Sequence, residues 1–88
     1  MPSKTVTVGS AVGLHARPAA IVAEAAEKYD ADIDLVLEGG DDEAVDAASA
    51  LMIMTLGAEK GARLVVTSDD QAAVDEIAAL IESDLDAV

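Results

Sequence analysis

The sequence predicts an α+β fold in which helices cover one face of an antiparallel sheet. Alternating polar and apolar residues mark short strands, and apolar side chains at three- and four-residue spacing mark two long helices. With one short helix added, the predicted order is β-α-β-β-α-β-α, which favours this layered arrangement. Because 88 residues suffice for one hydrophobic core, we expect residues 1–88 to form a single domain.

The N-terminal part predicts a strand followed by a long helix. Residues 4–8 alternate polar and apolar side chains, and Gly9-Ser10 follow as turn residues. A helix is expected to begin around Ala16 to Pro18, because proline fits inside a helix only in the first turn, where its missing N–H has no partner to lose. Helical spacing continues to Ala26, and the helix is expected to end near Tyr29-Asp30.

The middle of the chain predicts a hairpin and a short helix. Residues 33–37 have strand-like alternation, and residues 39–42 turn the chain towards a short segment that ends at Val45. Ser49 is a favourable N-cap for a helix over Ala50 to Leu56, and Gly57 is a favoured residue at its C-terminus.

The C-terminal part predicts a strand and an amphipathic helix. Ala62 to Thr67 are expected to form the fourth strand. Ser68-Asp69-Asp70-Gln71 match the capping-box pattern, in which Ser68 would be the N-cap. Helical spacing of apolar residues then continues from Val74 to Leu85, so the last helix is expected to run to the end.

The composition excludes several kinds of site. The chain is 52% hydrophobic but has one Tyr and no Phe or Trp, so its core must consist of aliphatic side chains and Met. Without Cys it has no disulfide and no thiolate chemistry. No apolar stretch approaches the roughly 20 residues of a membrane span, and the N-terminus lacks a signal-peptide pattern. We expect a soluble cytoplasmic protein without a cofactor; the acidic residues 41–43 indicate a solvated turn instead of a metal site.

The net charge of −13 comes from 18 acidic and 5 basic residues. Such a field repels phosphate backbones and anionic lipids, so neither nucleic acid nor a membrane is expected as a partner. Two explanations of the acidity remain: a surface adapted to a very salty cytoplasm, or one made for a basic partner. We favour the first, because the acidic residues are spread along the chain.

The candidate functional residue is His15, the single histidine, at the expected start of the first helix. Amide groups at a helix start have unpaired N–H groups and partial positive charge, which attract an anion. Arg17 adds a planar cation suited to phosphate oxygens, and Pro18 stiffens the first turn. A neutral imidazole is a good nucleophile whose phosphorylated product can pass the group on. We therefore expect a phosphoryl-carrying His15 beside a phosphate site formed by Ala16, Arg17 and Pro18.

The chain resembles the HPr family, the histidine-containing phosphocarrier proteins of the phosphoenolpyruvate-dependent sugar phosphotransferase system. Gly13-Leu14-His15-Ala16-Arg17-Pro18-Ala19 is similar to the family's phosphorylation-site motif, and residues 28–32 and 49–57 resemble other family segments. The resemblance implies an open-faced β-sandwich with a four-stranded antiparallel sheet covered on one face by two long helices and one short one. It also implies a pros-phosphohistidine at His15, with Arg17 as the phosphate partner. Enzyme I would supply the phosphoryl group, and an enzyme IIA domain of a sugar permease or dihydroxyacetone kinase type would receive it.

Two further expectations concern the short helix. Ser49 matches a serine that a kinase phosphorylates in some bacterial family members, although capping alone explains a serine there. Partner proteins are expected to dock on apolar residues beside His15, namely Ala16, Ala20, Ala50, Leu51 and Met54. At least one side chain of Met52-Ile53-Met54 is expected to be buried.

Three other functions remain open. The chain could be a regulatory module that acts through Ser49 and the short helix, a small enzyme, or an interaction domain without chemistry. Retention of His15 with Arg17 and Pro18 disfavours the first, and the lack of a second histidine or an evident acid–base pair disfavours the second. The leading hypothesis is a monomeric phosphoryl carrier and not an enzyme that turns over a free metabolite.

Overall fold

The computed structural model describes residues 2–9, 13–14, 16–39 and 43–83. The order of its elements is the predicted β-α-β-β-α-β-α. They are β1 (Ser3–Thr7), α1 (Ala16–Ala26), β2 (Ile33–Leu37), β3 (Val45–Asp46), α2 (Ala50–Thr55), β4 (Arg63–Ser68) and α3 (Gln71–Glu82). The predicted turn at residues 39–42 lies mostly outside the described residues. The prediction that the last helix runs to the end is wrong, because α3 ends at Glu82 and its C-cap, Ser83, has an extended backbone. Leu85 itself lies outside the described residues.

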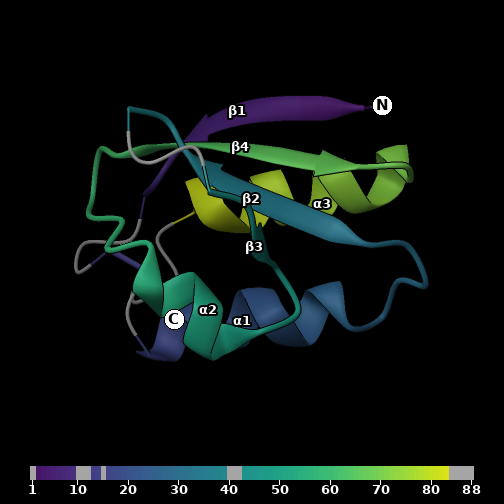
Figure 1. The fold of residues 1–88 in the computed structure, drawn as a ribbon, viewed down its shortest axis with the longest axis horizontal. Coiled ribbons are helices and arrows are strands. Elements are labelled where there is room, and N and C mark those ends of the chain that lie inside the picture. Colours follow the sequence, from purple (N-terminus) through teal and green to yellow (C-terminus); the bar gives the residue numbers. More distant parts are fainter. Residues whose placement is uncertain (1, 10–12, 15, 40–42, 84–88) are drawn as a thin grey trace.

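The strands form one four-stranded sheet in the order β1-β4-β2-β3, and every neighbouring pair is antiparallel. Figure 1 shows this order from top to bottom. Alternate residues of the central strands are buried, for example Leu64 and Val66 in β4, while Val65 and Thr67, which follow them in turn, stay partly exposed. One face of the sheet therefore faces the core and the other faces solvent.

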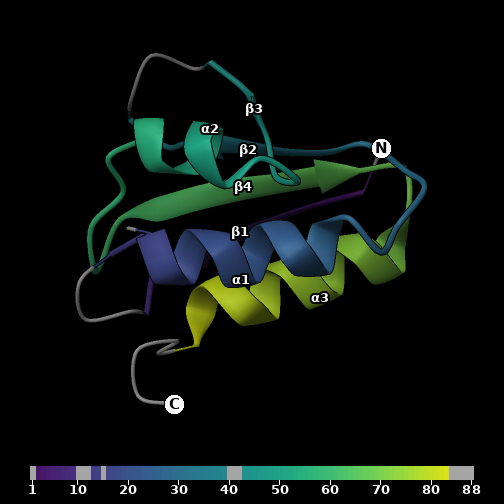
Figure 2. The same cartoon turned by 90° about the horizontal axis from the view of Figure 1, so that it is seen from below.

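The helices cover the buried face. Figure 2 shows α1 and α3 side by side; α3 also packs against β1 and β4, and α2 packs against α1. This arrangement confirms the predicted open-faced sandwich. Within the described part of the chain, no helix is both long and apolar enough to span a membrane.

The core is aliphatic, as the composition predicts. The largest fully buried side chains include Leu14, Leu35, Ile53, Leu64, Ile77 and Ile81. The aromatic Tyr29 lies at the edge of this core, just beyond α1, and its hydroxyl donates a hydrogen bond of 2.6 Å to Glu76 Oε1 on α3. This bond raises the pKa of Tyr29 above its ordinary value of 10.0, with smaller contributions from desolvation and from the nearby carboxylates of Glu76 and Asp70.

Several strand and helix boundaries differ from the predicted ones. β1 and β4 are each shifted by one residue from the predicted 4–8 and 62–67, and α2 ends at Thr55 instead of Leu56. The predicted hairpin segment ends at Val45, whereas β3 begins there and extends to Asp46, which is paired with Asp34 of β2. The first helix ends at Ala26 instead of near Tyr29. The amides of Lys28 and Tyr29 donate to carbonyls three residues earlier, so the chain leaves α1 through tightened turns.

The predicted capping box at the start of the last helix is wrong. Ser68 is the last residue of β4, is 1% exposed and is paired with Ile33, so it is held in the sheet. The N-cap is Asp70, whose Oδ1 accepts hydrogen bonds from the amides of Ala72 and Ala73 at 2.9 and 3.4 Å. Gln71 is the first helical residue and donates from Nε2 to Asp75 Oδ1 at 2.9 Å, so it does not reach back to Ser68.

Candidate functional site

The predicted phosphoryl carrier, His15, lies outside the described residues, but the residues on both sides of it are described. Leu14 and Pro18 are buried in the core, whereas Ala16 and Arg17 are exposed. The chain is thus anchored before and after position 15, while the first turn of α1 is open to solvent between these anchors. Pro18 occupies the first turn, as predicted.

The start of α1 has the electrostatic character that an anion site needs. The helix begins at Ala16, runs for 11 residues, and has no acidic side chain in its first turn. The partial positive charge of its first amides is therefore not offset by a carboxylate in that turn. Arg17 adds a cation to the same turn, in a chain with only 5 basic residues.

A contact with the loop after α2 supports the segment before position 15. The Leu14 amide donates to the carbonyl oxygen of Ala58 at 2.9 Å. Gly13 has a φ of 77°, and a Cβ built on it would lie 2.5 Å from the same oxygen. This contact could not be predicted from the sequence, because it joins backbone atoms of residues far apart in the chain.

The short helix α2 is capped as predicted. Ser49 has an extended backbone, and its hydroxyl oxygen accepts a hydrogen bond from the Met52 amide at 3.3 Å. This confirms the capping role of Ser49. Its phosphorylation stays a prediction.

Exposed apolar side chains gather on α2. Leu51 is 69% exposed, Met52 39% and Met54 37%, while Ile53 between them is fully buried. The burial of Ile53 confirms that at least one member of Met52-Ile53-Met54 belongs to the core.

The exposure of the other predicted docking residues is mixed. Ala16 and Ala20 on α1 are exposed, and Ala50 is half-buried against the core. Since α1 packs against α2, exposed apolar residues lie on two neighbouring helices. Met52 was not among the predicted docking residues, although its place between Leu51 and Met54 could have suggested it. We call Ala16, Ala20, Leu51, Met52 and Met54 the apolar surface.

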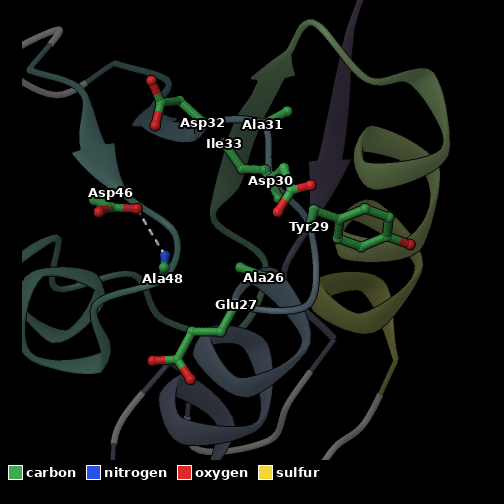
Figure 3. A pocket seen from close by; sticks show the side chains of 9 residues that line it. All are labelled: Ala26, Glu27, Tyr29, Asp30, Ala31, Asp32, Ile33, Asp46 and Ala48. Atoms are coloured by element: carbon green, nitrogen blue, oxygen red, sulfur yellow. Dashed lines mark hydrogen bonds between the residues drawn. The ribbon is translucent and has the colours of Figure 1, made fainter.

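A hollow of about 250 Å³ lies at the opposite end of α1 from Arg17. Figure 3 shows the residues that line it, which include the carboxylates of Glu27, Asp30, Asp32 and Asp46. Asp46 Oδ1 accepts a hydrogen bond from the Ala48 amide at 2.9 Å. Among the residues that the structure describes, no group of carboxylates is arranged to hold a metal ion. The hollow contains none of the predicted site residues.

Comparisons with known proteins agree on one family. Residues 2–83 match a family model described as the PTS HPr component phosphorylation site. The phosphocarrier protein HPr of Haloferax volcanii is 44% identical over 77 residues, which are 84% of this chain and 85% of that protein. The phosphocarrier protein HPr of Streptomyces coelicolor is 37% identical over 89 residues, with 98% of this chain and 94% of that protein covered.

Structural comparison leads to the same family. The crystal structure of a phosphocarrier protein HPr from Bacillus anthracis has a TM-score of 0.82 at 31% identity, covering 91% of this chain and 95% of that one. The chain therefore belongs to the HPr family, the phosphocarrier proteins of the phosphotransferase system.

Proposed function

We propose that His15 accepts a phosphoryl group from phosphorylated enzyme I and passes it to an enzyme IIA domain. Membership of the HPr family supports the class of reaction. The observation that carries the assignment to this site is the start of α1, where an acid-free first turn that contains Arg17 follows directly after position 15. Leu14 and Pro18, buried on either side, would keep the carrier in one place during transfer.

The proposed chemistry is a nucleophilic displacement at phosphorus in each of the two transfers, first to His15 and then from it. The lone pair of the unprotonated His15 Nδ1 forms the N–P bond while the bond between phosphorus and the donor breaks. In the second transfer Nδ1 is the leaving group, and the acceptor on the IIA domain forms the new bond. The transferring group carries negative charge on its equatorial oxygens, which the first-turn amides and the Arg17 guanidinium would stabilise.

The apolar surface is proposed to bind both partners in turn. A carrier must leave each partner after transfer, and small interfaces are typical of such transient encounters. The exposed side chains of Leu51, Met52 and Met54 supply apolar contact area on α2, with Ala16 and Ala20 beside them on α1.

The test is phosphorylation with phosphoenolpyruvate and enzyme I. We expect one acid-labile phosphoryl group per chain, none in His15→Ala, and loss of the label to an added enzyme IIA domain. As the check on folding, we expect thermal unfolding of His15→Ala to match that of the parent. Label that survives His15→Ala, or that is stable in acid, would contradict the proposal.

We further propose that residues 1–88 act as a single-domain, monomeric cytoplasmic carrier whose acidity is an adaptation to salt. In support of the last point, every Asp and Glu side chain among the described residues is exposed except that of Asp70, which is half-buried and caps α3. Solvated carboxylates of this kind suit a concentrated salt solution, in which their mutual repulsion is screened.

A further inference from the structure

Two residues between β1 and α1 form backbone hydrogen bonds, one with α3 and one with the loop after α2. The Gly9 amide donates to the Ile81 carbonyl of α3 at 3.0 Å, and the Leu14 amide donates to the Ala58 carbonyl at 2.9 Å. Leu14 is 2% exposed and Ala58 is 3% exposed, so the second bond is shielded from water. It is made by the residue that immediately precedes position 15.

Gly13 permits this close approach. A Cβ on Gly13 would lie 2.5 Å from the Ala58 oxygen and 2.8 Å from the Glu59 Cα. Both neighbours are backbone atoms, which cannot move aside as the end of a flexible side chain can. Gly13 is therefore required here for space as well as for its positive φ of 77°.

The helix α2 in turn fixes the place of Ala58. The fully buried Ile53 anchors α2 in the core, and the amides of Leu56 and Gly57 donate to the Ile53 and Met54 carbonyls. Gly57, with a φ of 64°, then turns the chain into the buried Ala58. The Ala58 carbonyl is thus held by the same helix that bears most of the apolar surface.

We infer that Ala58 is a positioning residue for phosphoryl transfer, acting through its carbonyl on the Leu14 amide. The inference rests on the proposed role of His15. Pro18 anchors the chain after position 15, and the Leu14–Ala58 bond anchors it before. Both anchors are needed, because a displacement of about 1 Å at a reacting group can cost about a hundredfold in rate.

An amide-to-ester replacement at Leu14 tests this directly. Incorporating the α-hydroxy analogue of leucine removes the N–H donor and keeps the buried side chain. The same replacement at Val8 is the matched control, because the Val8 amide donates to the Ala62 carbonyl at 2.8 Å in the same α2–β4 loop, and Val8 is 1% exposed. Val8 follows β1 and has no place in the proposed site.

We expect the two esters to unfold at similar temperatures but to transfer at different rates. With saturating phosphorylated enzyme I, the maximal rate of the Leu14 ester should fall about tenfold or more below that of the Val8 ester, with KM unchanged because the apolar surface is intact. Equal maximal rates for the two esters would overturn the inference.

A second readout separates this inference from the proposed function. The NMR order parameters of the Ala16 and Arg17 amides should fall in the Leu14 ester and not in the Val8 ester, whether or not enzyme I phosphorylates the chain. Unchanged order parameters would overturn the positioning role even if His15 carries phosphate. A parent chain that takes no phosphate would instead contradict the proposed function.

If the Leu14 ester does not fold, Gly13→Ala provides the same comparison. Its control is Gly39→Ala, which has a similar φ of 83° but no atom within 4 Å of the added Cβ. Slower transfer in Gly13→Ala than in Gly39→Ala supports the positioning role of Ala58. Equal maximal rates would refute it.

Discussion

Arg17 is exposed in the first turn of α1, where two features favour an anion. The turn has no acidic side chain, and its amides point towards the helix start. Arg63, the matched arginine, is also exposed and lies at the start of β4, where it pairs with Glu38 at 3.6 Å. Comparing substitutions of the two arginines therefore separates the effect of a cation at the site on phosphoryl transfer from the effect of the total charge of the chain.

Arg17→Ala is expected to slow phosphoryl transfer without weakening the fold. Loss of one preorganised donor to a transferring group should lower the transfer rate about tenfold or more. Rapid-quench measurements of transfer from enzyme I and to a IIA domain would show this, with thermal unfolding as the check on folding. Arg63→Ala, which removes the same charge from β4, should leave both rates close to those of the parent. Equal rates in Arg17→Ala and the parent would remove Arg17 from the mechanism.

The ionisation of Tyr29 can be followed by ultraviolet absorbance without a contribution from other aromatic residues, because the chain contains a single Tyr and no Trp. The hydrogen bond that its hydroxyl donates to Glu76 raises the pKa of Tyr29 above 10.0. The neutral phenol is the form that makes this bond, so its stabilising effect is present below the unfolded-state pKa and is lost as pH rises through the folded-state value.

We expect the tyrosinate absorbance of the folded parent to appear at a higher pH than in the unfolded chain. Glu76→Ala removes both the acceptor and the charge and should bring the midpoint back towards 10.0. Tyr29→Phe should be less stable than the parent at neutral pH, and the difference should shrink as Tyr29 ionises. Identical midpoints for the parent and Glu76→Ala would show that this bond does not form in solution.

At the scale of elements, α2 is the shortest helix described, and both of its ends depend on particular residues. Ser49 caps the first turn, Gly57 follows its C-cap with a positive φ, and Ile53 is its buried anchor. A helix of 6 residues is too short to be stable by itself, so these contacts decide whether the apolar surface keeps its shape.

Ser49→Ala is expected to cost roughly 0.5–2 kcal/mol of unfolding free energy, because the Met52 amide loses its acceptor. Ser49→Asp can still cap and should unfold close to the parent. Its added charge lies beside the apolar surface, where it should slow the encounter with phosphorylated enzyme I by repulsion. Ala72→Asp adds the same charge to the first turn of α3 and is the control. Equal transfer rates for Ser49→Asp and Ala72→Asp would place α2 outside the interface.

Local patterns predicted most of these elements, and the failures occurred where contacts are not local. Alternation of polar and apolar residues predicted the strand at residues 33–37, and the preference of proline for the first turn of a helix predicted the start of α1. Both signals depend only on neighbours in sequence. The capping box failed because pairing with Ile33 holds Ser68 in β4. The hydrogen bond from the Leu14 amide to the Ala58 carbonyl could not be predicted for the same reason, because a backbone contact between distant segments has no sequence pattern of its own.

At the scale of the whole molecule, electrostatic repulsion opposes the fold. Of 18 acidic residues, those described lie mostly at the surface, and the pairing of β2 with β3 places Asp34 directly opposite Asp46. Like charges in such a cross-strand pair are destabilising. The ion pair of Arg63 with Glu38 is exposed on both sides, at 59% and 47%, and contributes little against this repulsion.

The stability of the chain is therefore expected to rise with salt. The Debye length shortens from about 10 Å at 0.1 M to about 3 Å at 1 M, so only concentrated salt screens neighbouring surface carboxylates. Circular dichroism during thermal unfolding, from about 0.1 M to about 2 M potassium chloride, should show the melting temperature rising in the parent. Salt also strengthens apolar burial, so the decisive comparison is with a variant that combines Asp32→Asn, Asp34→Asn and Glu82→Gln. This variant keeps the apolar core and should depend less steeply on salt, with unchanged phosphorylation of His15. Parallel salt dependences would show that repulsion between these carboxylates is not what salt relieves, and would favour an acidic surface that binds a basic partner.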